Sequence, residues 1–218
     1  MGKILNAKKV ILSFLVVILL SACYPDENFS SRDRDIVVTS PEVEVDYSAF
    51  KTYSMPDTVV KIVNGEGVIK EVSLDAVILS NVRSNMNSLG YVEETNPKVN
   101  EPDLILLITA QEDKLKQFNE YPLWAWWGWW ANWFPGWGYG PNWSGVSPYL
   151  TGFVKYEAGT IHILMINPEN NDASDKQVPI IWSAVINGLI TGSENSIAER
   201  TTLNINTAFD QSPYLGTN

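Results

Sequence analysis

The chain has 218 residues, with 15 basic and 25 acidic side chains, a formal net charge of −10, and one cysteine. This acidic balance argues against nucleic acid as a partner, because phosphate binding draws on clustered lysine and arginine. A single cysteine excludes an intramolecular disulfide and a zinc thiolate cluster, so the stability has to come from an apolar core.

The first 22 residues have the pattern of a lipoprotein signal peptide. Three lysines precede an apolar run, residues 10–20, which is too short to cross a bilayer comfortably. Leu20-Ser21-Ala22-Cys23 then looks like a bacterial lipobox, in which the cysteine becomes the acylated mature N-terminus. An ordinary signal peptide with a chance cysteine is the alternative. The sole cysteine stands at the one position that the export chemistry uses, which favours lipidation at Cys23.

Removal of residues 1–22 would leave about 196 residues, enough for one domain of ordinary size. It would also remove three lysines, so the mature side chains carry 12 basic against 25 acidic groups and a net charge of about −13. Such a charge disfavours adhesion to anionic headgroups, whereas two or three acyl chains, such as palmitate, are sufficient for anchoring. We therefore expect a lipid-anchored protein of the cell envelope, at the outer membrane, with its periplasmic or surface face left open.

Residues 23–41 are polar and charged without sustained periodicity, which predicts a flexible acylated tether. The rest, residues 42–218, is expected to form a single domain. Its first element is a half-buried strand, because Val43, Val45 and Tyr47 alternate with acidic residues. A helix follows between Ser73 as N-cap and Gly90 as C-terminal stop, with an apolar side formed by Leu74, Ile78, Leu79, Val82, Met86 and Leu89.

The residue pattern in the second half of the domain predicts several strands and one helix. After a short strand at residues 91–93, residues 103–111 are almost continuously apolar, as in a central strand. Residues 160–167 and 178–190 read as two further strands joined by a polar hairpin loop, and a second helix starts at Ser193 and ends before Pro213. We predict an α+β domain with one mostly antiparallel sheet, two helices packed on one face, and an irregular insert rich in tryptophan and glycine.

The insert, residues 121–154, contains eight of the nine tryptophans and no charged residue. Tryptophan and tyrosine join a large apolar face to one polar group, so an exposed cluster suits stacking on sugars, a bilayer interface or a partner protein. Its glycines and prolines exclude one long helix or strand. Three interpretations stay open: rings packed onto the domain, a contact surface, or a largely disordered insert. The candidate contact residues are Trp124, Trp126, Trp127, Trp129, Trp130, Trp133, Trp137 and Trp143.

The patterns of common catalytic and metal sites are missing. No nucleophile elbow, phosphate loop or dinucleotide fingerprint is present, and the only histidine, His162, lies in a strand and is expected to be an edge or packing residue. The polar loop at 168–176 lacks the spacing of a calcium-binding hand. Asp103, Asp113 and Glu157 flank the insert, although nothing in their spacing demands a catalytic pair. We expect no catalytic residue, metal or cofactor.

The preferred interpretation is a non-enzymatic binding or assembly module that is anchored to the membrane through Cys23 and contacts an envelope protein or a glycan through its insert. A glycan-binding or glycan-hydrolysing envelope protein is the alternative.

Several segments together resemble a family of envelope lipoproteins known as domain of unknown function 4136. They are residues 45–53 (VDYSAFKTY), 102–105 (PDLI), 159–161 (GTI) and the pair Ile181-Trp182, in this order and spacing, with a glycine- and aromatic-rich insert near the middle. The resemblance runs from about Val43 to Tyr214 and implies the fold and an envelope location; the family has no established activity. Relatives of this type usually carry acidic residues where Leu164 and Asn167 stand, so a site built from those acids would be absent here.

Overall fold

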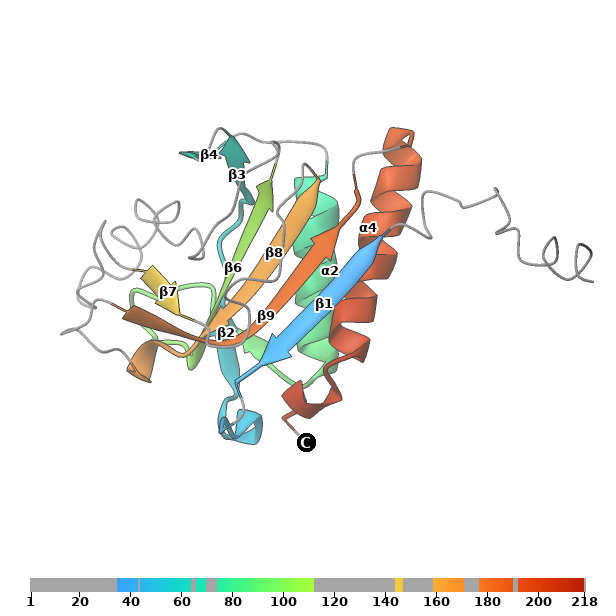
Figure 1. Cartoon of the computed structure of the whole chain (residues 1–218). Coiled ribbons are helices and arrows are strands. Elements are labelled where there is room, and N and C mark those ends of the chain that lie inside the picture. Colours follow the sequence, from blue (N-terminus) through green and yellow to red (C-terminus); the bar gives the residue numbers. More distant parts are fainter. Residues whose placement is uncertain are drawn as a thin grey trace, which may run out of the picture. The chain divides into compact units, whose positions relative to one another are not determined.

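A computed structural model of the chain describes residues 35–42, 44–63, 66–69, 74–111, 144–146, 159–170, 177–189 and 192–217. All of them belong to the compact unit Arg34–Asn218. The elements in Figure 1 are coloured along the chain. Strands both precede and follow the helix formed by Asp75–Ser88 in the sequence.

The sheet is organised around the strand β6 (Leu104–Gln111), which is the expected central strand. Its neighbour on one side is β8 (Thr160–Ile166), antiparallel to it, with Gln111 opposite Thr160. Antiparallel pairing continues through β9 (Gln177–Asn187) to β1 (Ile36–Pro41) at the sheet edge. Residues 104 to 109 of β6 are at most 1 % exposed, so this strand is buried on both faces.

On the other side of β6 the pairing is parallel, and the expectation of a mostly antiparallel sheet was therefore wrong. Both β2 (Thr52–Ser54) and β3 (Val60–Val63) run parallel to β6, and β5 (Val92–Glu93) runs parallel to β2. Two further strands complete the pairing: β4 (Glu66–Ile69), antiparallel to β3, and β7 (Ser144–Val146), parallel to β9. Parallel neighbours need a crossover connection, and the helix formed by Asp75–Ser88 lies in the connection between β3 and β6. The sheet is mixed, and the domain is α+β.

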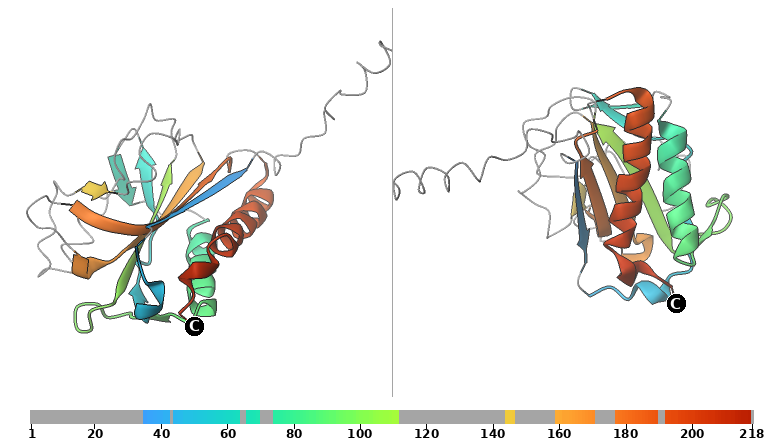
Figure 2. Two further views of the ribbon diagram at one scale, coloured as in Figure 1. Left: turned by 60° about the horizontal axis from the view of Figure 1, so that its bottom comes forward. Right: turned by 90° about the vertical axis from the view of Figure 1, so that its right-hand side faces the viewer.

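Two helices, α2 (Asp75–Ser88) and α4 (Glu194–Asp210), pack side by side on one face of the sheet, as predicted (Figure 2). Ser193 caps α4 by accepting a hydrogen bond from the Ser196 N–H, and Gly90 ends α2 with a φ of 96° that favours glycine. The helix α2 differs at its start: Leu74 is the N-cap and provides no side-chain hydrogen bond, while the expected cap, Ser73, lies outside the described residues.

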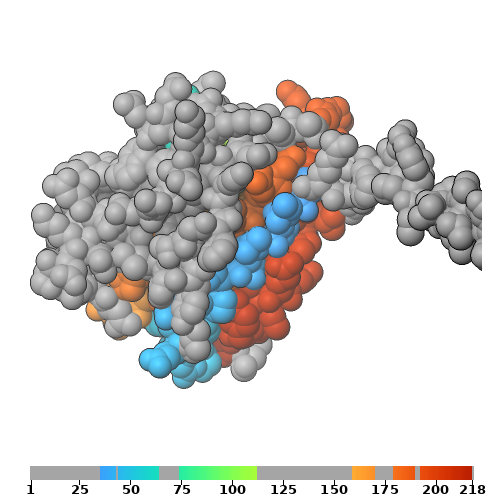
Figure 3. All heavy atoms as spheres, in the orientation of Figure 1, coloured from blue at the N-terminus to red at the C-terminus, as the bar shows by residue number. Residues whose placement is uncertain are grey.

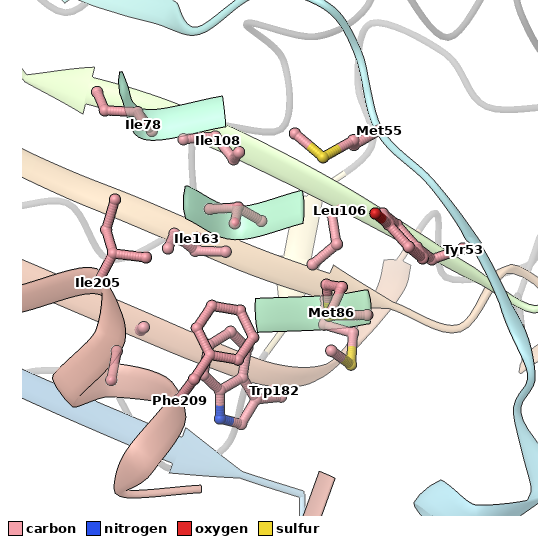
Figure 4. Close-up of a cluster of buried hydrophobic side chains, with 14 of the residues drawn as sticks. Tyr53, Met55, Ile78, Met86, Leu106, Ile108, Ile163, Trp182, Ile205 and Phe209 are labelled. Carbon is pink, nitrogen blue, oxygen red and sulfur yellow. The ribbon is translucent and has the colours of Figure 1, made fainter. Parts of the chain in front are cut away.

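The core lies between the helices and the sheet (Figure 4). Its largest member is Trp182 of β9, which is fully buried and packs against Phe209 of α4 with 5.3 Å between ring centroids. The indole N–H of Trp182 donates to Ser212 Oγ at 3.0 Å, so its one polar atom is satisfied. Met86 of α2 and Ile163 of β8 belong to the same cluster, and burial of such side chains contributes about 1.5–3 kcal/mol each.

The predicted tether ends too late, because β1 already begins at Ile36. Short β-branched runs such as IVVTSP become strands only when a partner is available, and here the whole length of β1 pairs with β9. The carboxylate of Asp35, just before β1, accepts hydrogen bonds from Arg200 Nε and Asn204 Nδ2 of α4, each at 2.8 Å. The ordered domain therefore includes residues that composition assigned to the tether.

The prediction of a strand from Val43 to Tyr47 was also wrong. Val43 lies outside the described residues, and Tyr47–Ala49 form a 3-10 helix whose cap, Asp46, accepts from the Ser48 N–H. Tyr47 is buried, its hydroxyl donates to the carbonyl oxygen of Ile181, and its ring lies 5.7 Å from that of Tyr214. The alternating apolar residues therefore belong to a helical turn that packs on the core, and they do not form a strand.

Two Asp–Arg ion pairs among the described residues allow a buried carboxylate to be compared with an exposed one. The side chains of Arg200 and Asp35 are 6 % and 2 % exposed, whereas those of Arg83 and Asp57 are 29 % and 92 % exposed. We expect Asp35→Asn to lower the free energy of unfolding by about 3 kcal/mol or more, because it leaves a buried guanidinium without its counter-charge. Asp57→Asn, the control, should lower it by less than about 1 kcal/mol. Urea denaturation measures both, and equal losses would contradict the assignment of Asp35 to the folded domain.

Candidate functional site

The predicted contact residues and the predicted lipidation site lie outside the described residues. This applies to Cys23 and to the eight tryptophans of the insert, Trp124, Trp126, Trp127, Trp129, Trp130, Trp133, Trp137 and Trp143. Of residues 121–154, only the backbone of β7 is described, and it pairs with the first residues of β9. The contact surface and the acylation therefore stay predictions.

The two ends of the long connection that carries the insert meet at one place in the sheet. Gln111 ends β6 beside Thr160, where β8 begins, and the Gly159 N–H donates to the Gln111 carbonyl at 2.8 Å. Antiparallel neighbours need only two to five connecting residues. Residues 112–158 are therefore an insertion into a hairpin that would close without them.

The insertion also reaches the opposite end of the sheet. Its strand β7 pairs with Gln177–Pro179, the start of β9, whereas Gln111 and Thr160 lie level with the end of β9. The described part of this connection, β7, therefore pairs at the opposite end of β9 from Gln111 and Thr160. The pairing of β7 ties the insert to the folded domain at a third point.

The face of the sheet turned away from the helices is as buried as the core face. Along β6 and β8 its side chains are at most 2 % exposed, namely Ile105, Leu107, Thr109, His162, Leu164 and Ile166. Strands buried on both faces read as continuous apolar runs, which explains the patterns of residues 103–111 and 160–167. Neither described helix lies on this face (Figure 2).

His162 is a packing residue on this second face and not an edge residue. It lies in β8, between β6 and β9, and is 2 % exposed. Burial lowers the pKa of its imidazole from 6.5 to about 3, because the charged form is poorly solvated there. The side chain is therefore neutral at pH 7 and is buried away from solvent, which does not suit a general base.

Asp103, one of the three carboxylates that flank the insert, has a structural role. Burial raises its pKa, but hydrogen bonds from the backbone N–H groups of Lys51 and Thr52, at 2.7 and 2.8 Å, outweigh that effect and leave the pKa lowered. The ionised carboxylate thus joins β2 to the start of β6. Asp113 and Glu157 lie outside the described residues, so their distance from Asp103 is not described.

A cavity of about 260 Å³ opens on the helix side, between the first turns of α2 and α4 and the ends of β3, β6 and β8. Its walls are mostly apolar, and Lys61, Gln111, Thr160 and Thr201 add polar groups. Lys61 forms an ion pair with Asp75 in which the side chains are 4 % and 11 % exposed. Sequence reasoning missed this cavity. Its one local signal is the lysine within the apolar run of residues 59–63.

A second hollow, about 180 Å³, lies beside β2, β5 and α2. Arg83 occupies its wall and is bound by Glu93 at 3.0 Å and by Asp57 at 2.7 Å. Both carboxylates of this lining are thus engaged by the same arginine. Among the described residues no cluster of three or more His, Cys, Asp or Glu is placed to hold a metal ion, and no helix there has the length and apolarity to cross a membrane.

A mixed sheet with two helices packed on one face makes this an α+β domain. The chain belongs to the family called domain of unknown function DUF4136, whose model matches residues 37–214. Comparison with curated protein sequences gave no match.

Solved structures with a similar fold include a DUF4136 family protein from Bacteroides thetaiotaomicron VPI-5482, with 23 % identity and a TM-score of 0.64 over 85 % of this chain and 100 % of that one. The PelC dodecamer from Paraburkholderia phytofirmans matches with 9 % identity and a TM-score of 0.41 over 84 % and 99 % of the two chains. A PDZ domain protein from Parabacteroides distasonis matches with 15 % identity and a TM-score of 0.41 over 83 % and 36 %.

The lowered pKa of His162 gives a pH dependence with a definite sign. The unfolded chain binds a proton at pH 6.5 and the folded one only near pH 3, so the free energy of unfolding falls as the pH decreases between these values. We expect this histidine to contribute a decrease of about 1.4 kcal/mol per pH unit. Urea denaturation between pH 6.5 and 4.5 should show a shallower slope for His162→Leu than for the wild type. Identical slopes would contradict the buried neutral state.

Proposed function

We propose that this protein is a lipid-anchored, non-enzymatic binding or assembly module of the bacterial cell envelope. Its acylated N-terminus would be Cys23, and its contact element would be the tryptophan-rich insert at residues 121–154. The observation that carries the proposal is the position of the insert between β6 and β8, whose facing ends need no long connection.

Length and composition support a binding role for the insertion. Loops longer than about 12–15 residues inside a compact domain are usually functional or disordered. This loop contains an uncharged stretch with eight tryptophans in a chain of net charge −10. Exposure of even half of these rings would exceed the apolar patch that monomers normally tolerate, which is typical of a contact surface.

The anchoring part of the proposal is supported by the lipobox, Leu20-Ser21-Ala22-Cys23, and by the polar composition of the segment that follows it. Asp35, which α4 holds through Arg200 and Asn204, already belongs to the folded domain. A short polar linker between an acylated cysteine and a folded domain suits a protein carried at a membrane surface.

The described residues favour binding over catalysis. His162 is neutral and buried, and Asp103 is committed to backbone hydrogen bonds of Lys51 and Thr52. The partner would be an envelope protein, with an envelope glycan as the alternative, because tryptophan faces serve both kinds of contact.

Acylation is tested by Cys23→Ser. We expect cells that express the wild type with labelled palmitate to yield a labelled protein in the membrane fraction. The variant should lose the label and keep the unprocessed signal peptide, because the acylated thiol is absent. Cell fractionation with mass measurement of the N-terminal peptide reads both results. A labelled variant, or an unlabelled wild type, would refute the anchor.

The contact element is tested by replacing Trp126, Trp127, Trp129 and Trp130 with serine. We expect this variant to fold and to lose association with its envelope partner, because four large apolar faces disappear. Co-sedimentation with outer-membrane vesicles and with purified peptidoglycan distinguishes a protein or lipid partner from a glycan. Circular dichroism checks the fold.

The control replaces four exposed apolar residues outside the insert with serine, namely Ile36, Val92, Val99 and Leu203. It should keep both the fold and the association. Loss of folding in the tryptophan variant, with folding kept in the control, would show instead that the insert rings belong to the core, and would overturn the contact role.

A further inference from the structure

We propose that the cavity between the first turns of α2 and α4 is a binding site for a small, uncharged, mainly apolar molecule with one hydrogen-bonding group. The site uses no residue of the insert and does not depend on the contact role proposed above. Its walls come from β3, β6, β8, both helices and the turn after β9, so it exists only in the folded domain.

The apolar part of the ligand is set by the cavity walls. Ile78 of α2, Ile161 of β8 and Ile197 of α4 line it, together with Leu74, Ala110 and Leu189. Ligand pockets are lined mostly by hydrophobic side chains with a few placed polar groups. A cavity of 150 Å³ accepts benzene, so about 260 Å³ suits a molecule of roughly ten non-hydrogen atoms. A complete membrane acyl chain is too large, which points to a free small molecule.

Charge matching in the cavity excludes an ionic ligand. Lys61 is the cation of the lining, and its ammonium group is paired with the carboxylate of Asp75. Gln111 donates its amide N–H to the Ile62 carbonyl at 3.2 Å and is likewise engaged. A charged ligand would lose its hydration in this apolar space and would find Lys61 and Asp75 already paired with each other. Burial of such an unpaired charge is strongly unfavourable.

One residue of the cavity lining, Thr201, has a polar side-chain atom that is not hydrogen-bonded within the described part of the chain. Thr201 is fully buried, and its hydroxyl has no hydrogen-bond partner among the described residues. Helical threonines commonly donate to the carbonyl four residues earlier, as Thr207 of the same helix does to Leu203 at 2.9 Å. Buried hydroxyl groups are nearly always hydrogen-bonded, so the Thr201 side chain fits a site completed by a hydroxyl, carbonyl or amide group of a bound molecule.

The test uses the full chain in lipid nanodiscs with 13C-labelled isoleucine methyl groups, titrated with cyclohexanol. We expect saturable shifts at Ile78, Ile161 and Ile197, which line the cavity, and none at Ile105 or Ile180, which serve as internal controls. Cyclohexanecarboxylate, which adds a charge, should cause no saturable shift. Shifts that do not saturate, or that appear equally at Ile105, would overturn the proposal, as would unchanged spectra, which mean that the chain itself fills the cavity.

Two variants separate the hydroxyl from the apolar walls. Thr201→Val should weaken cyclohexanol binding about fivefold to tenfold, because one hydrogen bond is lost, and should leave methylcyclohexane binding unchanged. Ala110→Leu, which fills the cavity, should abolish binding of both probes while the Ile105 methyl signal stays in place. Equal affinity of Thr201→Val and the wild type for cyclohexanol, or retained binding by Ala110→Leu, would refute the site.

Discussion

Burial of β6 on both faces is the constraint on which the rest of the domain depends. This strand pairs with β8 on one side and with β2 and β3 on the other, so antiparallel and parallel halves of the sheet meet along it. A strand without exposed side chains can lie only in the middle of a layered structure. The helices cover one face, and the side chains of the other face, such as Leu107 and Leu164, are fully buried as well. Figure 3 shows β1 and α4 at the molecular surface, as expected for the outer elements of this arrangement.

Two buried ion pairs fix how the helices lie on the sheet. Lys61 of β3 binds Asp75 at the start of α2, and Arg200 of α4 binds Asp35 beside β1. A buried charge without its partner is strongly unfavourable, so each pair disfavours any arrangement that separates the helix from its strand. Each helix is thus held by apolar packing along its length and by a buried charged contact in its N-terminal half.

The elements with strong periodicity were predictable from the sequence, and those defined by distant partners were not. The apolar run of residues 103–111 and the helical spacing from Leu74 to Leu89 correspond to β6 and α2. The pair of strands β3 and β4 was not predicted, because Lys61 interrupts the short apolar run of β3. The burial of Lys61 depends on its ion pair with Asp75, which the local sequence does not indicate. Parallel pairing was missed for a similar reason, since local alternation does not specify the neighbour. The cavity combines residues from several elements, so only the folded structure brings them together, and the insert stays a prediction.

The position of β1 has a consequence for when the domain can fold. Its hydrogen-bonding partner is β9, and Asp35 is bound by Arg200, which lies 165 positions later in the chain. Closing so long a loop costs entropy before any contact compensates it, and structures rich in distant contacts fold slowly. The N-terminal strand stays without its partner until nearly the entire chain has emerged. The domain can therefore complete its fold only after its last helix, α4, has been synthesised.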